Sequence, residues 1–326
     1  LAGTVALHYS IPIGVAIAVL IAVVVSSYRQ TILAYPPGGG SYIVAKDNLG
    51  TLPGLVAGSA LLVDYVLTVS VSTASGVAAI TSAFPVLYPH RIVICVACVL
   101  AVMLANLRGL RETGRTFAVP TYGFILALTI LIIGGFYQFF TQGAPPPPAT
   151  LPMVEPLSVF LVLRAFSGGC AALTGIEAVA NGVQAFKPPE SRNASITLAW
   201  MAFILGSSFM AVTFLSHYFH IVPSAEETVV SMLARQVFGR TWMYYVIQAF
   251  TAIILLLAVT TSFAGFPMLA SLMARDGFLP RQFANLGCAV IDADELSHQV
   301  VNQADVRREL VEWWGPAIVA ADGRID

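Results

Sequence analysis

The chain reads Arg164-Ala-Phe-Ser-Gly-Gly-Cys-Ala-Ala-Leu-Thr-Gly-Ile-Glu177 inside an apolar run of about residues 157–186, which is long enough to cross a bilayer. The middle of this stretch contains Ser, Gly and Thr, which weaken a helix. A membrane helix interrupted at mid-depth exposes backbone N–H and C=O groups that lipid cannot satisfy, so the interruption must line a cavity enclosed by protein. Broken helices of this kind form the binding sites of secondary transporters. The stretch therefore predicts a transporter.

The composition also indicates a membrane protein. The chain is 57% hydrophobic, only 10% charged, and has a mean hydropathy of +0.82, whereas soluble proteins carry about 25% charged residues. Seven apolar segments are long enough to be spanning helices; they lie at about residues 11–33, 54–82, 91–107, 116–139, 157–185, 194–216 and 242–269. We therefore expect an all-α integral membrane protein whose fifth span is broken.

The distribution of basic residues predicts the orientation. With the first connection placed in the cytoplasm, that side holds nine basic residues, namely Arg29, Lys46, Arg108, Arg111, Arg115, Lys187, Arg192, Arg275 and Arg281. The other side holds only Arg91, Arg235 and Arg240. Because cytoplasmic loops carry the excess of Lys and Arg, we expect a multi-pass membrane protein with its C-terminus in the cytoplasm.

The charge balance changes near residue 287. Residues 1–287 carry 13 basic against 9 acidic side chains, whereas residues 288–326 carry 3 against 8. This shift predicts a membrane domain over residues 1–286 and a separate soluble tail over residues 287–326.

Asp64 is the most informative single residue, since a carboxylate at mid-membrane costs about 2.5–3.5 kcal/mol on insertion scales. Thr68, Ser72 and Gly76 follow it at helical spacing, so that one face of the second span is polar and small. Tyr65 is adjacent and offers a phenol oxygen. Asp64 either binds a cation or carries a proton, or it is a structural carboxylate bonded to hydroxyls of a neighbouring helix.

Two substrate classes fit the broken helix. Ser167 and Thr174 offer hydroxyl oxygens beside unpaired carbonyls, a ligand set that suits a hard monovalent cation. The second half-helix instead offers a positive dipole end that suits the carboxylate of an amino acid. Glu177 either carries a proton or holds the two half-helices together, and Arg164 is near enough to the outer end to reach the headgroups.

Five motifs carry a family resemblance, and they are AYPPGGGSYIVAKDNLG, LLVDYVLTVSVSTASG, NLRGLRETG, RAFSGGCAALTGIEAVANGVQAFKPPESRNA and MARDGFLPRQFA. In this order they resemble the amino acid–polyamine–organocation (APC) transporter superfamily, and within it the potassium–proton symporter branch of KimA-like permeases. The resemblance covers residues 1 to about 286. It implies the inverted-repeat fold in which the first and sixth helices are broken.

Matched to that fold, the seven spans are the family's second to eighth helices, and Ser167–Gly175 lies in the sixth. The resemblance thus implies a chain truncated at both ends, which lacks the first helix and the half of the site that this helix carries. Leu1 in place of Met points the same way. We expect that such a fragment does not transport alone.

The resemblance also implies site residues. The expected substrate or ion ligands are Asp64, Tyr65, Thr68, Ser167, Gly168 and Thr174, with a monovalent cation at Asp64, Thr68 and Thr174. Proton coupling is expected at Asp64 or Glu177. Potassium taken up with protons is the favoured substrate, and an amino acid or polyamine is the alternative. Further expected partners are the lipid bilayer and, for the intact protein, a second copy in a homodimer; no nucleic acid and no resident cofactor are expected.

The tail resembles a different family. LGCAVIDADELSHQVV and RRELVEWWGPAIVAADGRID are similar to dephospho-coenzyme A kinase downstream of its phosphate-binding loop. Such a loop needs Gly-x-x-x-x-Gly-Lys-Ser/Thr, and neither Lys46 nor Lys187 lies in one. Asp292 and Asp294, at that family's acidic motif, would have no nucleotide to act on. We expect an α/β-like chimeric fragment that packs weakly, and no enzyme.

Overall fold

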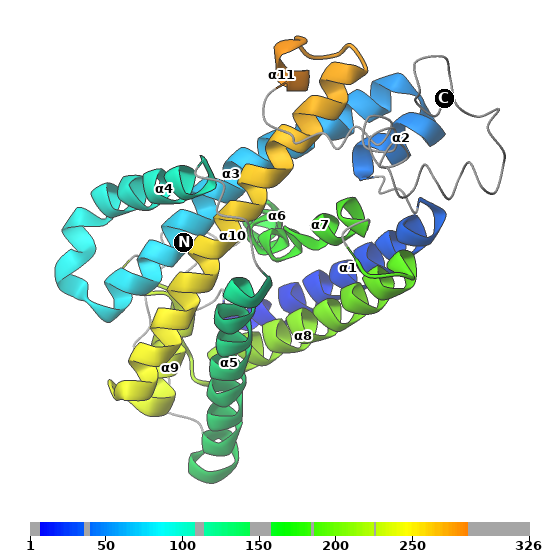
Figure 1. Cartoon of the computed structure of the whole chain (residues 1–326). Coiled ribbons are helices and arrows are strands. Elements are labelled where there is room, and N and C mark those ends of the chain that lie inside the picture. Colours follow the sequence, from blue (N-terminus) through cyan, green and yellow to red (C-terminus); the bar gives the residue numbers. More distant parts are fainter. Residues whose placement is uncertain are drawn as a thin grey trace, which may run out of the picture. The chain divides into compact units, whose positions relative to one another are not determined.

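The computed structural model describes residues 7–35, 40–107, 114–143, 158–183, 186–224 and 226–285, and all the secondary structure in these ranges is helical (Figure 1). Seven stretches are long and apolar enough to cross a membrane, namely Tyr9–Ala34, Thr51–Ala83, Pro85–Asn106, Phe117–Gln142, Val159–Ala180, Glu190–Tyr218 and Trp242–Arg275. The prediction of an all-α protein with seven spans is confirmed. The predictions for the tail, Asp292 and Asp294 included, lie outside the described residues.

The helices follow one another as α1 (Leu7–Ala34), α2 (Ser41–Leu49), α3 (Thr51–Ala83), the 3₁₀ turn η2 (Pro85–His90), α4 (Arg91–Leu107), α5 (Gly114–Gln142), α6 (Val159–Gly169), η3 (Cys170–Leu173), α7 (Ile176–Asn181), α8 (Glu190–Tyr218), α9 (Val229–Phe238), α10 (Trp242–Arg275) and α11 (Gln282–Asn285). A first compact unit ends at Phe266, and a second begins at Pro267 inside α10. All contacts described below belong to the first unit.

Helices α1 and α8 run side by side in opposite directions (Figure 1). The Ser10 hydroxyl lies 3.1 Å from Nδ1 of His217 near one end of the pair, and Arg29 Nε donates to Ser195 Oγ at 3.1 Å near the other. Buried apolar side chains of α1, α7 and α8 and of the residues next to α7 fill the space between these helices; they are Ile17, Ile21, Val25, Ile32, Ile176, Ala180, Val183, Ala194 and Leu198. This core fixes α7 against the α1–α8 pair.

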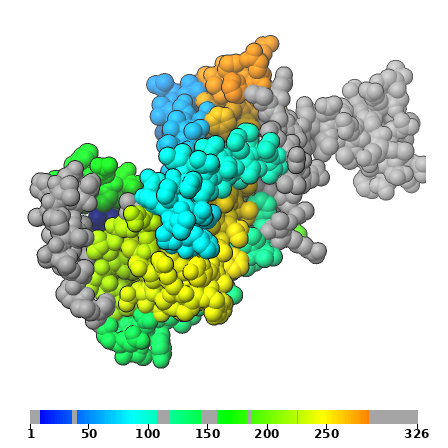
Figure 2. Space-filling model, turned by 90° about the vertical axis from the view of Figure 1, so that its left-hand side faces the viewer, coloured from blue at the N-terminus to red at the C-terminus, as the bar shows by residue number. Residues whose placement is uncertain are grey.

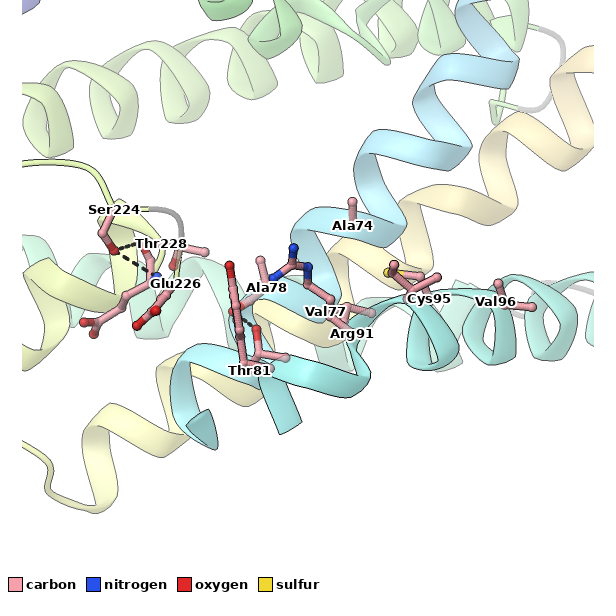
Figure 3. A pocket seen from close by; sticks show the side chains of 13 residues that line it. Ala74, Val77, Ala78, Thr81, Arg91, Cys95, Val96, Ser224, Glu226 and Thr228 are labelled. Carbon is pink, nitrogen blue, oxygen red and sulfur yellow. Dashed lines mark hydrogen bonds between the residues drawn. The ribbon is translucent and has the colours of Figure 1, made fainter. Parts of the chain in front are cut away.

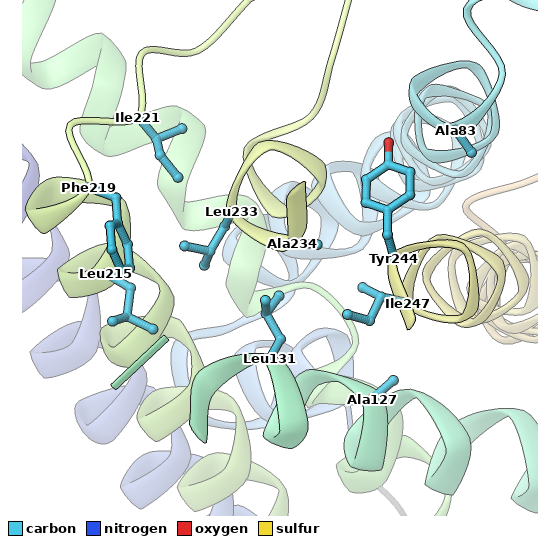
Figure 4. Close-up of a cluster of buried hydrophobic side chains, with 10 residues drawn as sticks. All are labelled: Ala83, Ala127, Leu131, Leu215, Phe219, Ile221, Leu233, Ala234, Tyr244 and Ile247. Atoms are coloured by element: carbon cyan, nitrogen blue, oxygen red, sulfur yellow. The ribbon is translucent and has the colours of Figure 1, made fainter. Parts of the chain in front are cut away.

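A second core surrounds α9 and draws on α3, α5, α8 and α10 (Figure 4). Its fully buried members include Leu131, Leu215, Leu233 and Tyr244. With only ten residues, α9 is too short to cross a bilayer, and it packs against α3, α5 and α8. The lengths of the apolar runs in the sequence do not predict this helix.

The polar groups around this second core are paired in hydrogen bonds. The Tyr244 hydroxyl donates to the carbonyl of Ser82 at 2.9 Å, and the Thr228 N–H donates to Ser82 Oγ at 3.1 Å. Ser231 Oγ donates to Glu227 Oε1 at 2.9 Å and lies 2.8 Å from the Tyr244 hydroxyl. We call Ser82, Glu227, Thr228, Ser231 and Tyr244 the α9 network; it joins α3, α9 and α10.

Candidate functional site

The fifth span is broken, as the sequence predicts. Helix α6 ends at Gly169, the 3₁₀ turn η3 follows, Thr174 is extended, and Gly175 has a φ of +87° before α7 begins at Ile176. A residue with a Cβ at this left-handed position would cost about 1–2 kcal/mol. A Cβ at Gly169 would overlap the side chain of Ile17 on α1. The two glycines therefore permit the turn and the close approach of α6 to α1.

The interruption begins at Cys170, three residues later than the sequence suggests, so Ser167 and Gly168 belong to the last turn of α6. Both are exposed, as is Arg164 on the same helix. The Thr174 hydroxyl donates to the carbonyl of Ala171 at 2.7 Å, which leaves its lone pairs available for a ligand. The described part of the chain shows no hydrogen bond or ion pair between these residues and Asp64, and their binding role stays a prediction.

The structure brings other predicted residues together. On α7, the Glu177 carboxylate accepts a hydrogen bond from the phenol of Tyr65 on α3 and interacts electrostatically with Asp64. The Tyr28 phenol of α1 interacts with both carboxylates and lies 2.9 Å from the Ser41 hydroxyl of α2. We call Tyr28, Asp64, Tyr65 and Glu177 the carboxylate cluster. It joins the broken span to α1 and α3.

The Tyr65 ring is fixed from two sides. Its hydroxyl is bonded to Glu177, and its ring packs on the backbone of α10 at Gly265. A Cβ added to Gly265 would lie 2.8 Å from Tyr65 Cε1 and Cζ and 3.0 Å from its hydroxyl oxygen. Only glycine leaves room for the ring at this point of α10, so the phenol is directed at the carboxylate.

Thr68 follows Asp64 by one helical turn and, like Thr73 on the same helix, differs from several other hydroxyls of α3. Its Oγ1 is buried and has no hydrogen-bond partner among the described residues, whereas Ser70 and Ser82 donate to backbone carbonyls within the helix. Buried polar atoms in native structures are almost always paired with protein, water or ligand. Thr68 therefore supplies an oxygen that is free to bind a water or an ion. Asp64 itself is half-buried.

The predicted site residues did not include Tyr28, Ser41 or Gly265. Ser41 lies in the Pro-Gly-rich motif that follows α1 and that carries part of the family resemblance. Tyr28 and Gly265 carry no local signal, because their roles depend on which helices pack together.

Comparisons with known proteins agree with the described helices. A family model for "Amino acid permease" matches residues 2–289. The "Potassium transporter KimA" of Bacillus subtilis (strain 168) is 47% identical over 285 residues, which cover 86% of this chain and 47% of that protein. The chain thus spans about half the length of this curated relative. Both descriptions are of transport proteins, as the sequence predicted, and the chain belongs to the amino acid permease family of the APC superfamily.

Proposed function

We propose that this chain forms part of the cation pathway of a membrane transporter, which takes up potassium together with protons. The observation that carries the proposal is the carboxylate cluster, in which Asp64 and Glu177 interact inside the span region. The Thr68 hydroxyl, one helical turn from Asp64, is unpartnered among the described residues. Ionisable residues at membrane depth are costly and typically serve ion or proton pathways. The name of the 47% identical relative supports potassium as the ion.

The ligands offered are hard oxygens. Asp64 contributes a carboxylate and Thr68 a hydroxyl from one face of α3, and a hard cation favours such donors. The broken span offers the hydroxyls of Ser167 and Thr174 and the carbonyls freed at η3, with Gly168 leaving open space at the helix end. We propose that the cation is bound between α3 and the broken span.

The same cluster supports proton coupling. Two carboxylates that interact electrostatically cannot both keep their charge cheaply in a weakly solvated site. Entry of either a cation or a proton relieves that repulsion, so the two ions are linked through Asp64 and Glu177. The Tyr65 phenol donates a hydrogen bond to the Glu177 carboxylate.

The alternative substrate is an amino acid, as the description of the family suggests. Its carboxylate would have to bind at the start of α7, where the helix dipole is positive. Glu177 lies in the first turn of α7 and already places a negative charge there. This argues for a cation at the site.

We further propose that the protein lies in the bacterial plasma membrane, with the connection after α1 and the end of α10 in the cytoplasm. The basic residues of the loops support this orientation. The homodimer implied by the resemblance stays a prediction.

The test is a chimera in which residues 2–286 replace the matching part of the Bacillus subtilis transporter, expressed in bacteria that lack their own potassium uptake. We expect uptake of radiolabelled rubidium that is driven by a proton gradient and lost in Glu177→Gln. Glu190→Gln, at the start of α8, is the matched control and should transport normally. Uptake of amino acids without rubidium would overturn the proposal and establish the alternative.

A further inference from the structure

A cavity of about 420 Å³ lies where α3 ends and α4 begins, away from the carboxylate cluster. Its walls come from α3, η2, α4 and the segment that precedes α9. Figure 3 shows Ser224, Glu226 and Thr228 at one end, Cys95 and Val96 at the other, and Arg91 between them. The cavity therefore has one polar and one apolar end.

At the polar end, Arg91 and Glu226 form no ion pair with any residue that the structure describes. The Arg91 guanidinium stacks on the Tyr88 ring at 4.2 Å, and in the part of the chain that the structure describes no carboxylate lies within 4 Å of it. Glu226 is exposed and also forms no ion pair with a described residue. Its neighbour Glu227 differs, because it is bound to Arg235 at 2.9 Å. Arg91 and Glu226 are thus available to a ligand that carries both charges.

The apolar end reaches below the membrane surface. Ala74 lines the cavity and precedes the end of α3 at Ala83 by nine residues, which is about 13 Å along a helix. Cys95 and Val96 line it from the second turn of α4. Both helices are span candidates that end at this connection, so this wall lies at the depth of acyl chains. On the face shown in Figure 2, the surface of α4 borders that of α9.

We propose that this cavity binds a phospholipid whose headgroup carries an ammonium group, namely phosphatidylethanolamine. Arg91 binds the phosphate, Glu226 accepts hydrogen bonds from the ammonium, and an acyl chain lies along the α3–α4 wall. Charge-assisted pairs of this kind are stronger than neutral hydrogen bonds. Phosphatidylglycerol lacks the cation for Glu226, and the quaternary ammonium of phosphatidylcholine has no N–H to donate. A soluble zwitterion would leave the apolar end unfilled.

The first test is native mass spectrometry of the purified chain with equal amounts of the three lipids. We expect phosphatidylethanolamine to be retained over the other two. Arg91→Gln should weaken its retention about fivefold, whereas Glu226→Gln should remove the preference for it over phosphatidylglycerol. Arg240→Gln, which removes an exposed arginine that does not line the cavity, is the matched control. Equal retention of all three lipids, or equal loss in Arg240→Gln, would overturn the proposal.

The second test uses the Cys95 thiol, which lines the apolar end. Phosphatidylethanolamine should slow its modification by an apolar maleimide, as followed by peptide mapping, and leave the rates of Cys98 and Cys170 as they are. Soluble glycerophosphoethanolamine should not protect Cys95. If it protects as well as the lipid does, the cavity is a site for soluble zwitterions and the lipid assignment is wrong.

Discussion

The C-terminal end and the middle of α3 differ in how their polar groups are satisfied. Near its C-terminus, the Ser82 carbonyl accepts a hydrogen bond from Tyr244, and the Ser82 hydroxyl accepts one from the Thr228 N–H. The same hydroxyl donates to a carbonyl of its own helix, so both the hydroxyl and the carbonyl of Ser82 are paired. Nearer the middle, the Thr68 hydroxyl has no partner among the described residues, and Asp64 is only half-buried. Polar groups that are fully hydrogen-bonded stabilise the fold, whereas polar groups without a protein partner are suited to binding a ligand.

Helix α10 contacts α3 in both regions but in opposite ways. At Tyr244 it contributes a fully buried side chain that donates a hydrogen bond. At Gly265 it contributes only backbone and leaves room for the Tyr65 ring. Helix α10 therefore contributes a hydrogen bond to the α9 network near its start. About two-thirds of its length further on, it makes room for a side chain of the carboxylate cluster. Substitutions along α10 and α3 can separate the two roles.

The largest effect is expected from Asp64→Asn in the chimera. Rubidium uptake should fall about tenfold or more, because the cation loses a charged ligand. The free energy of unfolding in mixed micelles should stay constant or rise, since the repulsion with Glu177 is removed. A loss of more than about 1 kcal/mol of stability with intact uptake would show instead that Asp64 is a structural carboxylate.

The α9 network should respond in the opposite sense. Tyr244→Phe removes the donor to Ser82 and leaves buried oxygens unpaired, so it should lower the free energy of unfolding by about 1–3 kcal/mol. Uptake per folded molecule should not change. Tyr245→Phe is the control, because Tyr245 is an exposed neighbour on the same helix. If Tyr244→Phe impairs uptake without loss of stability, this network is not merely structural.

Gly265→Ala tests whether α10 positions the Tyr65 phenol. The added Cβ would crowd the ring, which should cost about 1–3 kcal/mol of stability and lower uptake as Tyr65 moves from Glu177. Gly206→Ala on α8 is the control, since nothing lies within 4 Å of its Cβ position; there the higher helix propensity of alanine should add about 0.5–1 kcal/mol. Unchanged uptake in Gly265→Ala would show that uptake does not require the Tyr65 phenol at this position.

The spans and the broken helix could be predicted because they depend on local sequence. Bilayer thickness sets the length of an apolar run, and for α4 the predicted bounds of 91–107 agree with the structure. The start of the break was predicted too early because two glycines weaken an isolated helix. In the structure Gly169 instead allows α6 to pack closely on Ile17, and the helix continues to that residue.

The partners of the site residues could not be predicted from spacing. Helical periodicity placed Asp64 and Thr68 on one face of α3, but the bond from Tyr65 to Glu177 joins residues 112 positions apart in the sequence. Tyr28 and Ser41 join the same region only because α1, α2 and α3 pack together. Such pairs depend on tertiary packing, which the hydrophobic pattern of one chain does not predict.

Thr68→Val is the substitution with the smallest expected effect. Valine keeps the shape of threonine and removes only the unpartnered hydroxyl, so the free energy of unfolding should stay within about 0.5 kcal/mol or rise. The rubidium concentration at half-maximal uptake should increase about fivefold, as expected for the loss of one oxygen ligand worth about 1 kcal/mol. Thr129→Val is the control, since that exposed hydroxyl donates to the carbonyl of Ile125. If Thr68→Val destabilises the protein by more than about 1 kcal/mol and leaves uptake unchanged, the Thr68 hydroxyl is a structural group like that of Ser82. The distinction between the middle and the C-terminal end of α3 would then fail at this residue.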